Sequence, residues 1–137
     1  MYHKTTIVGN VGKDPEMRYT PSGQAVTSFS MAANSQYTNT QGEQVKETVW
    51  FRVTTWGQQA EVCNQYVKKG MLVFVEGKLT PDKATGGPRI WTTSDGKPAA
   101  NFEINASTVR FLSGGKGKVE QQQQTTQQTT EEEDLPF

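Results

Sequence analysis

One strand-like stretch of the chain, VKETVWFRVTTWG, alternates aromatic and basic residues with apolar ones. Side chains of a β-strand point to the two faces of a sheet in turn. The first face carries Trp50, Arg52, Thr54 and Trp56. The second face carries Val49, Phe51 and Val53, which is the pattern of a core. Exposed indoles usually mean that a partner covers them, and an interior arginine would need a dedicated partner. We therefore predict a binding face, with a second buried face, as in a sandwich, as the alternative.

The chemistry suited to such a face is the binding of nucleobases and phosphates. Stacking on aromatic rings contributes about 1–3 kcal/mol per base without regard to sequence, and phosphates attract Arg and Lys. Two further rings are available, Tyr37 after an earlier strand pattern and Trp91 in a long excursion. The remaining candidate phosphate ligands are Arg18, Lys68, Lys69, Lys78, Lys83, Arg89 and Lys97. For any one of them alone, a solvated surface charge is the commoner role.

Residues suited to catalysis or metal binding are sparse. His3 is the only histidine, and we expect it to be a surface residue near the terminus. Cys63 is the only cysteine and falls on an apolar stripe, so we expect a small buried hydrophobe. The segment VGNVGKDP lacks the GK[ST] of a phosphate loop. No His or Cys cluster and no pair of carboxylates suggests a site. We therefore expect no enzyme activity, no metal site and no cofactor.

The elements that must position these residues are mainly strands. Strand patterns occur in HKTTIVGNVG, QAVTSFSMAANSQY, VKETVWFRVTTWG, MLVFVEGKLT and NFEINASTVRFL. The one helix candidate is QQAEVCNQYVKKG, whose apolar stripe consists of Val62, Cys63, Tyr66 and Val67. Lys68 and Lys69 would fall in its last turn, and Gly70 would end it. Three strands, a helix and two strands predict an all-β protein with one short helix, a five-stranded OB-fold Greek-key barrel. Other small barrels remain compatible with this pattern.

The composition divides the chain near Ser113. The following stretch, rich in Gly, Gln and Thr, cannot bury enough apolar surface to offset the entropy of ordering. We therefore expect a folded domain at 1–113, a disordered linker at 114–130 and an acidic tip at 131–137. Residues 1–118 hold all 14 Lys and Arg against nine acids, a charge of +5, and residues 119–137 carry five acids and no base. A basic body favours an anionic ligand.

The start of the chain shows no apolar signal segment, and no run of residues has the length of a membrane span. A single cysteine excludes an internal disulfide framework. We therefore expect a cytoplasmic protein without a membrane partner.

Three segments together carry a specific resemblance to a known family. They are IVGNVGKDPEMRYTPSGQAVTSFSMAAN, VWFRVTTWGQQAEVCNQYVKKGMLVFVEGKL and the terminal DLPF. They closely resemble the bacterial single-stranded DNA-binding proteins, SSB, over residues 4–112 and again at the last few residues. The resemblance implies an OB-fold domain that assembles as a homotetramer, wraps single-stranded DNA regardless of sequence and acts at the nucleoid.

The resemblance also implies roles for individual residues. Bases stack in the family at positions that match Tyr37, Trp50, Trp56 and Trp91. Basic positions along the family's DNA path match Arg18, Arg52 and Lys69. The excursion TPDKATGGPRIWTTSDGKP, which holds Arg89, is longer than the usual hairpin, and Gln58 stands where a basic residue is common.

The C-terminal tip of the family is a docking peptide for replication, recombination and repair proteins. By resemblance, Leu135, Pro136 and Phe137 would fill an apolar pocket of such a partner. Asp134 and the three glutamates before it would steer the tip toward basic surfaces, and the acidic tail would compete with DNA for the basic body. A role in solubility alone would explain the acids but not the apolar residues.

Rival functions come from other classes of protein. An adaptor, an OB domain that binds only protein, would give no response to an oligonucleotide. A small nuclease would need a metal site or a His and carboxylate cluster, which the sequence lacks. An RNA-binding protein of the cold-shock kind is the nearest alternative, but the length, the helix and the tail speak against it.

Overall fold

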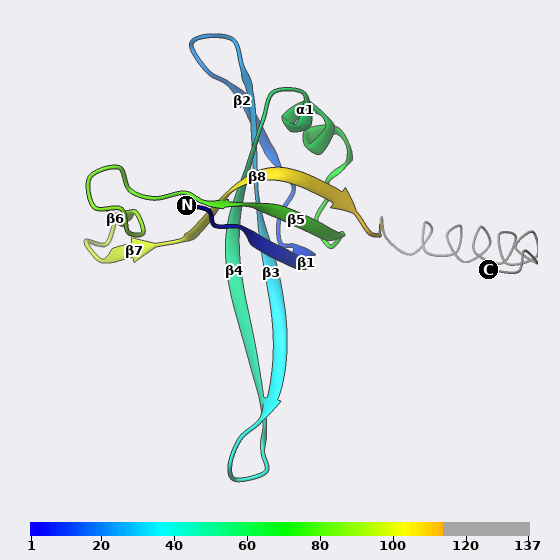
Figure 1. Cartoon of the computed structure of the whole chain (residues 1–137), viewed down its shortest axis with the longest axis vertical. Coiled ribbons are helices and arrows are strands. Elements are labelled where there is room, and N and C mark those ends of the chain that lie inside the picture. Colours follow the sequence, from blue (N-terminus) through cyan, green and yellow to red (C-terminus); the bar gives the residue numbers. More distant parts are fainter. Residues whose placement is uncertain (114–137) are drawn as a thin grey trace, which may run out of the picture.

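Eight strands and one helix follow one another along residues 1–113, the part of the chain that this computed structural model describes (Figure 1). In chain order they are β1 Thr5–Val11, β2 Glu16–Tyr19, β3 Ala25–Thr38, β4 Gln44–Trp56, α1 Gly57–Tyr66, β5 Leu72–Leu79, β6 Ile90–Thr92, β7 Pro98–Ala100 and β8 Phe102–Phe111. The predicted linker at 114–130 and tip at 131–137 lie outside the described residues.

Five of these strands close a barrel. The sheet order is β1-β5-β8-β4-β3-β2, and an additional pairing of β1 with β3 joins the two ends. β4 and β8 run parallel, and the other pairs in this sheet are antiparallel. The short strand β2 extends the sheet beyond β3. The predicted all-β OB barrel of five strands with one helix is confirmed.

The core forms because the strands of the barrel bury one side of their alternating side chains. It consists of Ile7, Val11, Phe29, Met31, Val53, Cys63, Val67, Met71, Val73, Val75, Ile104, Ala106 and Val109. The helix is tied to the barrel by two buried threonines. The Thr27 hydroxyl donates to the Ala60 carbonyl at 2.6 Å, and the Thr55 hydroxyl donates to the Thr27 carbonyl at 3.2 Å. Each buried hydroxyl therefore has a partner, as burial requires.

The end of α1 differs from the prediction. The helix stops at Tyr66, so Lys68 and Lys69 lie beyond it and not in its last turn. The physical reason is the burial of Val67, which has extended backbone and is only 2% exposed. The chain then turns at Gly70, with φ of +89°, to enter β5.

The apolar stripe predicted for the helix is buried only in part. Cys63 and Val67 belong to the core, and Cys63 is the small buried hydrophobe that was predicted. Val62 and Tyr66 stay exposed, because the helix turns that flank away from the barrel. Ala60, which the predicted stripe did not include, is buried against the barrel as well.

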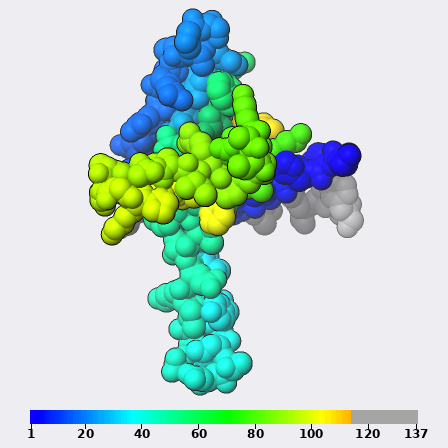
Figure 2. Space-filling model, turned by 90° about the vertical axis from the view of Figure 1, so that its left-hand side faces the viewer, coloured from blue at the N-terminus to red at the C-terminus, as the bar shows by residue number. Residues whose placement is uncertain are grey.

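Two hairpins extend from the barrel (Figures 1 and 2). β3 and β4 continue past it as a long two-stranded ribbon, paired as far as Thr38 and Gln44. The second hairpin, formed by β6 and β7, is a separate sheet within the excursion between β5 and β8, which lies across the body in Figure 2. Val49, predicted as a core residue, is instead 36% exposed, because it lies where the ribbon leaves the barrel.

Candidate nucleic-acid interface

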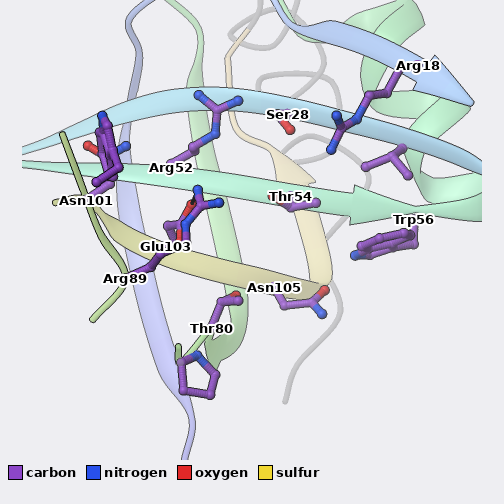
Figure 3. A pocket seen from close by; sticks show the side chains of 13 residues that line it. Arg18, Ser28, Arg52, Thr54, Trp56, Thr80, Arg89, Asn101, Glu103 and Asn105 are labelled. Carbon is purple, nitrogen blue, oxygen red and sulfur yellow. Dashed lines mark hydrogen bonds and ion pairs between the residues drawn. The ribbon is translucent and has the colours of Figure 1, made fainter. Parts of the chain in front are cut away.

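A groove of about 660 Å³ opens between the barrel and the excursion (Figure 3). Arg18 reaches it from β2, Arg52 from β4 and Arg89 from the residues just before β6. Trp56 and Trp91 contribute two aromatic rings to the lining. The groove thus gathers five of the twelve aromatic and basic candidates predicted within the described part of the chain.

The register of the sheet explains this gathering, because paired residues share a face. One row across the strands runs from Arg18 to Val26 to Trp56. The next row consists of Ser28, Thr54 and Asn105. A third row consists of Ser30, Arg52 and Glu103. The face of β4 that carries Arg52, Thr54 and Trp56 is therefore continued by residues of β2, β3 and β8. Together they form a polar and aromatic floor of the groove.

A second hollow of about 280 Å³ continues the groove toward the ribbon. It shares Ser28, Arg52 and Asn101 with the groove and adds Trp50, whose side chain is 54% exposed. Gly12 makes room for this indole, since a Cβ there would lie 2.5 Å from Cζ3 of Trp50. The face predicted from Trp50 to Trp56 is therefore open along its whole length.

The lysine at position 69 lies beside the second hollow. Its backbone N–H donates to Oδ1 of Asp14 at 2.9 Å, and Asp14 lines that hollow together with Lys13. The bond brings the turn after α1 next to the loop between β1 and β2. Lys69 therefore lies at the border of the interface, although it does not line the groove.

Arg89 is engaged by two neighbours within the groove. Its Nη2 lies 2.7 Å from Oε1 of Glu103, and its Cζ lies 5.8 Å from the centre of the Trp91 ring. Figure 3 shows the Arg89 side chain against Glu103 in the middle of the site. The guanidinium is therefore already paired in the absence of any ligand.

Tyr37 and Lys78 lie outside the groove. Tyr37 pairs with Val45 on the ribbon, whereas Trp50 pairs with Ala32. Val45 and Trp50 are an odd number of residues apart on β4, so Tyr37 and Trp50 occupy opposite faces of the ribbon. Lys78 faces a separate hollow, where its Nζ lies 6.0 Å from the centre of the Tyr2 ring.

Several lining residues were not singled out from the sequence. They are Lys13, Ser28, Thr80, Asn101, Glu103 and Asn105. Alternation with the buried Ile104 could have revealed Glu103 and Asn105, because both flank it on the outward face of β8. Nothing in the sequence pattern marks Thr80 or Asn101, which reach the site through the course of the excursion.

The site is suited to binding and offers little for catalysis. In residues 1–113 no group of three or more His, Cys, Asp and Glu side chains could hold a metal ion. Burial raises the pKa of the Cys63 thiol, opposed in part by a hydrogen bond with Thr55, so the thiol stays neutral in the core. What the groove offers instead is guanidinium groups beside flat rings, the complement of a polyanion with planar groups. As for membranes, no described helix is long and apolar enough to cross one.

Comparison with known families gives a direct match. The sequence model of the single-strand binding protein family matches residues 2–112. The chain belongs to this family. Its membership agrees with the expectation of a binding protein that is not an enzyme.

Individual relatives of the family are identical to this chain at about a third of the aligned positions. It is 35% identical over 112 residues to the single-stranded DNA-binding protein of Neisseria meningitidis serogroup A, covering 82% of this chain and 60% of the relative. It is 36% identical over 116 residues to the protein of the same name from Xanthomonas campestris pv. campestris, covering 85% and 63%. The chain therefore spans less than two thirds of the length of these curated relatives.

Solved structures of the family have the same fold. Plasmodium falciparum SSB in complex with ssDNA superposes with a TM-score of 0.68 at 27% identity, covering 82% of this chain and 97% of that one. A deletion mutant of the single-stranded DNA-binding protein from Thermus aquaticus gives a TM-score of 0.64 at 28% identity, covering 84% and 52%.

Proposed function

We propose that this chain binds single-stranded DNA, without preference for sequence, along the groove and the second hollow. The observation that carries the proposal is the open row of two indoles and one guanidinium formed by Trp50, Arg52 and Trp56. The relatives named as single-stranded DNA-binding proteins and the Plasmodium complex with ssDNA support the same ligand.

In this proposal, unpaired bases stack on aromatic rings and phosphates pair with nearby cations. Trp56 and Trp91 would hold bases within the groove, and Trp50 would continue the path toward the ribbon, where Tyr37 on the opposite face would contribute less. Arg18 and Arg52 would contact phosphates, with Lys69 at the border of the second hollow. Each phosphate neutralised should contribute about −0.7 to the slope of log affinity against log salt. A duplex should bind weakly, because its bases are already stacked on one another.

Two of the predicted phosphate ligands, Arg89 and Lys78, are less available to a strand in the groove than Arg18 and Arg52. Arg89 would contribute positive charge while it stays paired with Glu103, so its contact with phosphate would be shared. Lys78 would act only where the strand leaves the groove past Asn105, its cross-strand neighbour. We therefore rank these two residues below Arg18 and Arg52 as phosphate ligands.

A tryptophan-fluorescence titration tests the proposal directly. The chain has three tryptophans, and all of them line the groove or the second hollow, so the signal reports on this surface. Oligo-dT should quench strongly, a duplex of equal length should quench little, and the affinity for oligo-dT should fall as salt rises. An absence of quenching by oligo-dT at low salt would contradict the proposal and favour the adaptor.

We further propose that the chain acts as a homotetramer. Val8 on β1 is 50% exposed and Phe102 on β8 is 59% exposed, so the single chain leaves large apolar side chains on the barrel surface uncovered. Light scattering after size exclusion should give a mass near four times 15.2 kDa. A mass equal to one chain at micromolar concentration would contradict this assembly.

We also propose that the acidic tip recruits replication, recombination and repair proteins, in the cytoplasm at the nucleoid. The support is the charge of residues 119–137 and the apolar residues Leu135 and Phe137 at the tip. In this division of the chain, 1–113 binds DNA, 114–130 links and 131–137 docks. Deleting the residues after Gly117 should raise the DNA affinity at low salt, because the competing charge is lost. An unchanged affinity would contradict the competition between tail and DNA.

A further inference from the structure

The excursion between β5 and β8 is joined to the barrel by one side-chain ion pair. Residues 81–101 form hydrogen bonds among themselves in the Asp82 loop and across β6 and β7. Among the hydrogen bonds and ion pairs of residues 1–113, only that of Arg89 with Glu103 joins this segment to the barrel. This ion pair therefore contributes to the position of the segment over the groove.

Glu103 is an unexpected residue at this place. Its side chain is only 13% exposed, and its cross-strand neighbour on β4 is Arg52, so the carboxylate lies on the floor of the groove. A negative charge in a surface that receives phosphates repels the ligand. Its presence needs another physical reason.

We propose that Glu103 is a positioning residue that fixes Arg89 and, through Arg89, holds the ring of Trp91 over the groove. A charge-assisted hydrogen bond joins the first pair at 2.7 Å. The guanidinium carbon then lies 5.8 Å from the centre of the Trp91 ring, within the range of a cation–π contact. Arg89 is thus a link between the barrel and an aromatic ring as well as a source of positive charge. This inference rests on the proposed function only where it concerns DNA.

Simple electrostatics and positioning predict opposite results for Glu103→Gln. If the carboxylate acted only through its charge, its removal would strengthen DNA binding. If it positions Trp91, the same change releases the excursion and weakens binding. The sign of the effect therefore separates the two explanations.

The first measurement needs no DNA. In the full chain carrying Trp50→Phe and Trp56→Phe, Trp91 is the sole indole, because the chain has three tryptophans. Glu103→Gln in this background should raise the acrylamide quenching constant of Trp91 about twofold, since the ring loses its partner. Arg89→Gln should do the same, and the double variant should add nothing further, because both changes break one contact. An unchanged quenching constant in both single variants would overturn the inference.

A matched control removes the same charge from the same excursion. Asp95 lies between β6 and β7, outside both hollows, and forms no ion pair in the described residues. Asp95→Asn should leave the quenching constant of Trp91 unchanged. An increase equal to that of Glu103→Gln would assign the effect to net charge and overturn the inference.

The second measurement uses labelled oligo-dT and the chain with all three tryptophans. Glu103→Gln should weaken binding about threefold to tenfold although the groove has lost a negative charge. Tighter or unchanged binding would overturn the role of Glu103 in DNA binding. If the parent chain fails to bind oligo-dT, the proposed function fails, while the quenching experiment still decides whether Glu103 positions Trp91.

Discussion

The β3–β4 ribbon and the β6–β7 hairpin both extend from the barrel, but different forces hold them. The ribbon is a direct continuation of two barrel strands, paired residue by residue from Val26 and Trp56 to Thr38 and Gln44. The hairpin forms its own sheet and is joined to the barrel through the side chains of Arg89 and Glu103. Backbone hydrogen bonds place the first arm, and one side-chain ion pair helps to place the second.

This difference separates two ways of presenting an aromatic ring. Trp50 and Trp56 are positioned by the backbone of β4, so the loss of one side-chain contact should leave them in place. Trp91 is positioned by a neighbouring side chain, so a single substitution can release it. The following predictions, from the largest effect to the smallest, compare the barrel with these extensions.

The largest difference is expected between Gly77 and Gly87. Gly77 lies in β5 at a register shift against β8, where a Cβ would overlap the carbonyl oxygen of Asn105. Gly87 lies in the excursion, where the nearest atom to a Cβ would be Oγ1 of Thr85 at 3.7 Å. Gly77→Ala should lower the free energy of unfolding by about 3 kcal/mol, the upper end for overpacking. Gly87→Ala should change it by less than about 0.5 kcal/mol. Urea unfolding of both variants checks this, and equal losses would contradict the contrast.

The next comparison sets Trp56 in the groove against Tyr37 on the ribbon. Trp56→Ala should weaken binding of labelled oligo-dT by about 1–3 kcal/mol, the value for one stacked base. Tyr37→Ala should cost less than about 1 kcal/mol, because Tyr37 lies on the face of the ribbon opposite Trp50. Anisotropy titrations at fixed salt measure both. Equal losses would mean that the DNA crosses from one face of the ribbon to the other.

A third comparison uses the salt dependence of binding. Arg52 lines both hollows, whereas Lys78 lies beside Tyr2 outside them. Arg52→Gln should reduce the slope of log affinity against log salt by about 0.7, the value for one phosphate contact. Lys78→Gln should leave the slope nearly unchanged. Titrations at four salt concentrations distinguish the two, and a larger effect of Lys78→Gln would move the DNA path to the hollow between Lys78 and Tyr2.

The smallest effect is expected at Gly12. The added methyl of Gly12→Ala would displace the Trp50 indole or force it off its rotamer, at a cost of about 0.5–1.5 kcal/mol. The emission maximum of Trp50, read in a chain with Trp56→Phe and Trp91→Phe, should shift, and the melting temperature should fall by a few degrees. Ser22→Ala, in the exposed turn between β2 and β3, serves as the control. An unshifted emission maximum would contradict this prediction, because the Trp50 indole would then accommodate the added methyl without moving.

The sequence by itself determined the five barrel strands, the presence of the helix and the faces of β4. Period-two alternation depends only on strand geometry, so Arg52, Thr54 and Trp56 could be assigned to one face before the fold was known. The core position of Cys63 followed in the same way from helical spacing. Alternation could not show that β3 and β4 run on past the barrel, and for this reason the prediction for Val49 was wrong.

The tertiary structure decided which of these residues meet. The parallel pairing of β4 with β8 brings Glu103 beside Arg52, and the path of the excursion brings Arg89 and Trp91 over the same groove. These contacts join residues far apart in the chain, and their register depends on barrel closure and on a bulge at Gly77. Local patterns carry no information on such pairings, because the pairings depend on how whole strands pack against one another.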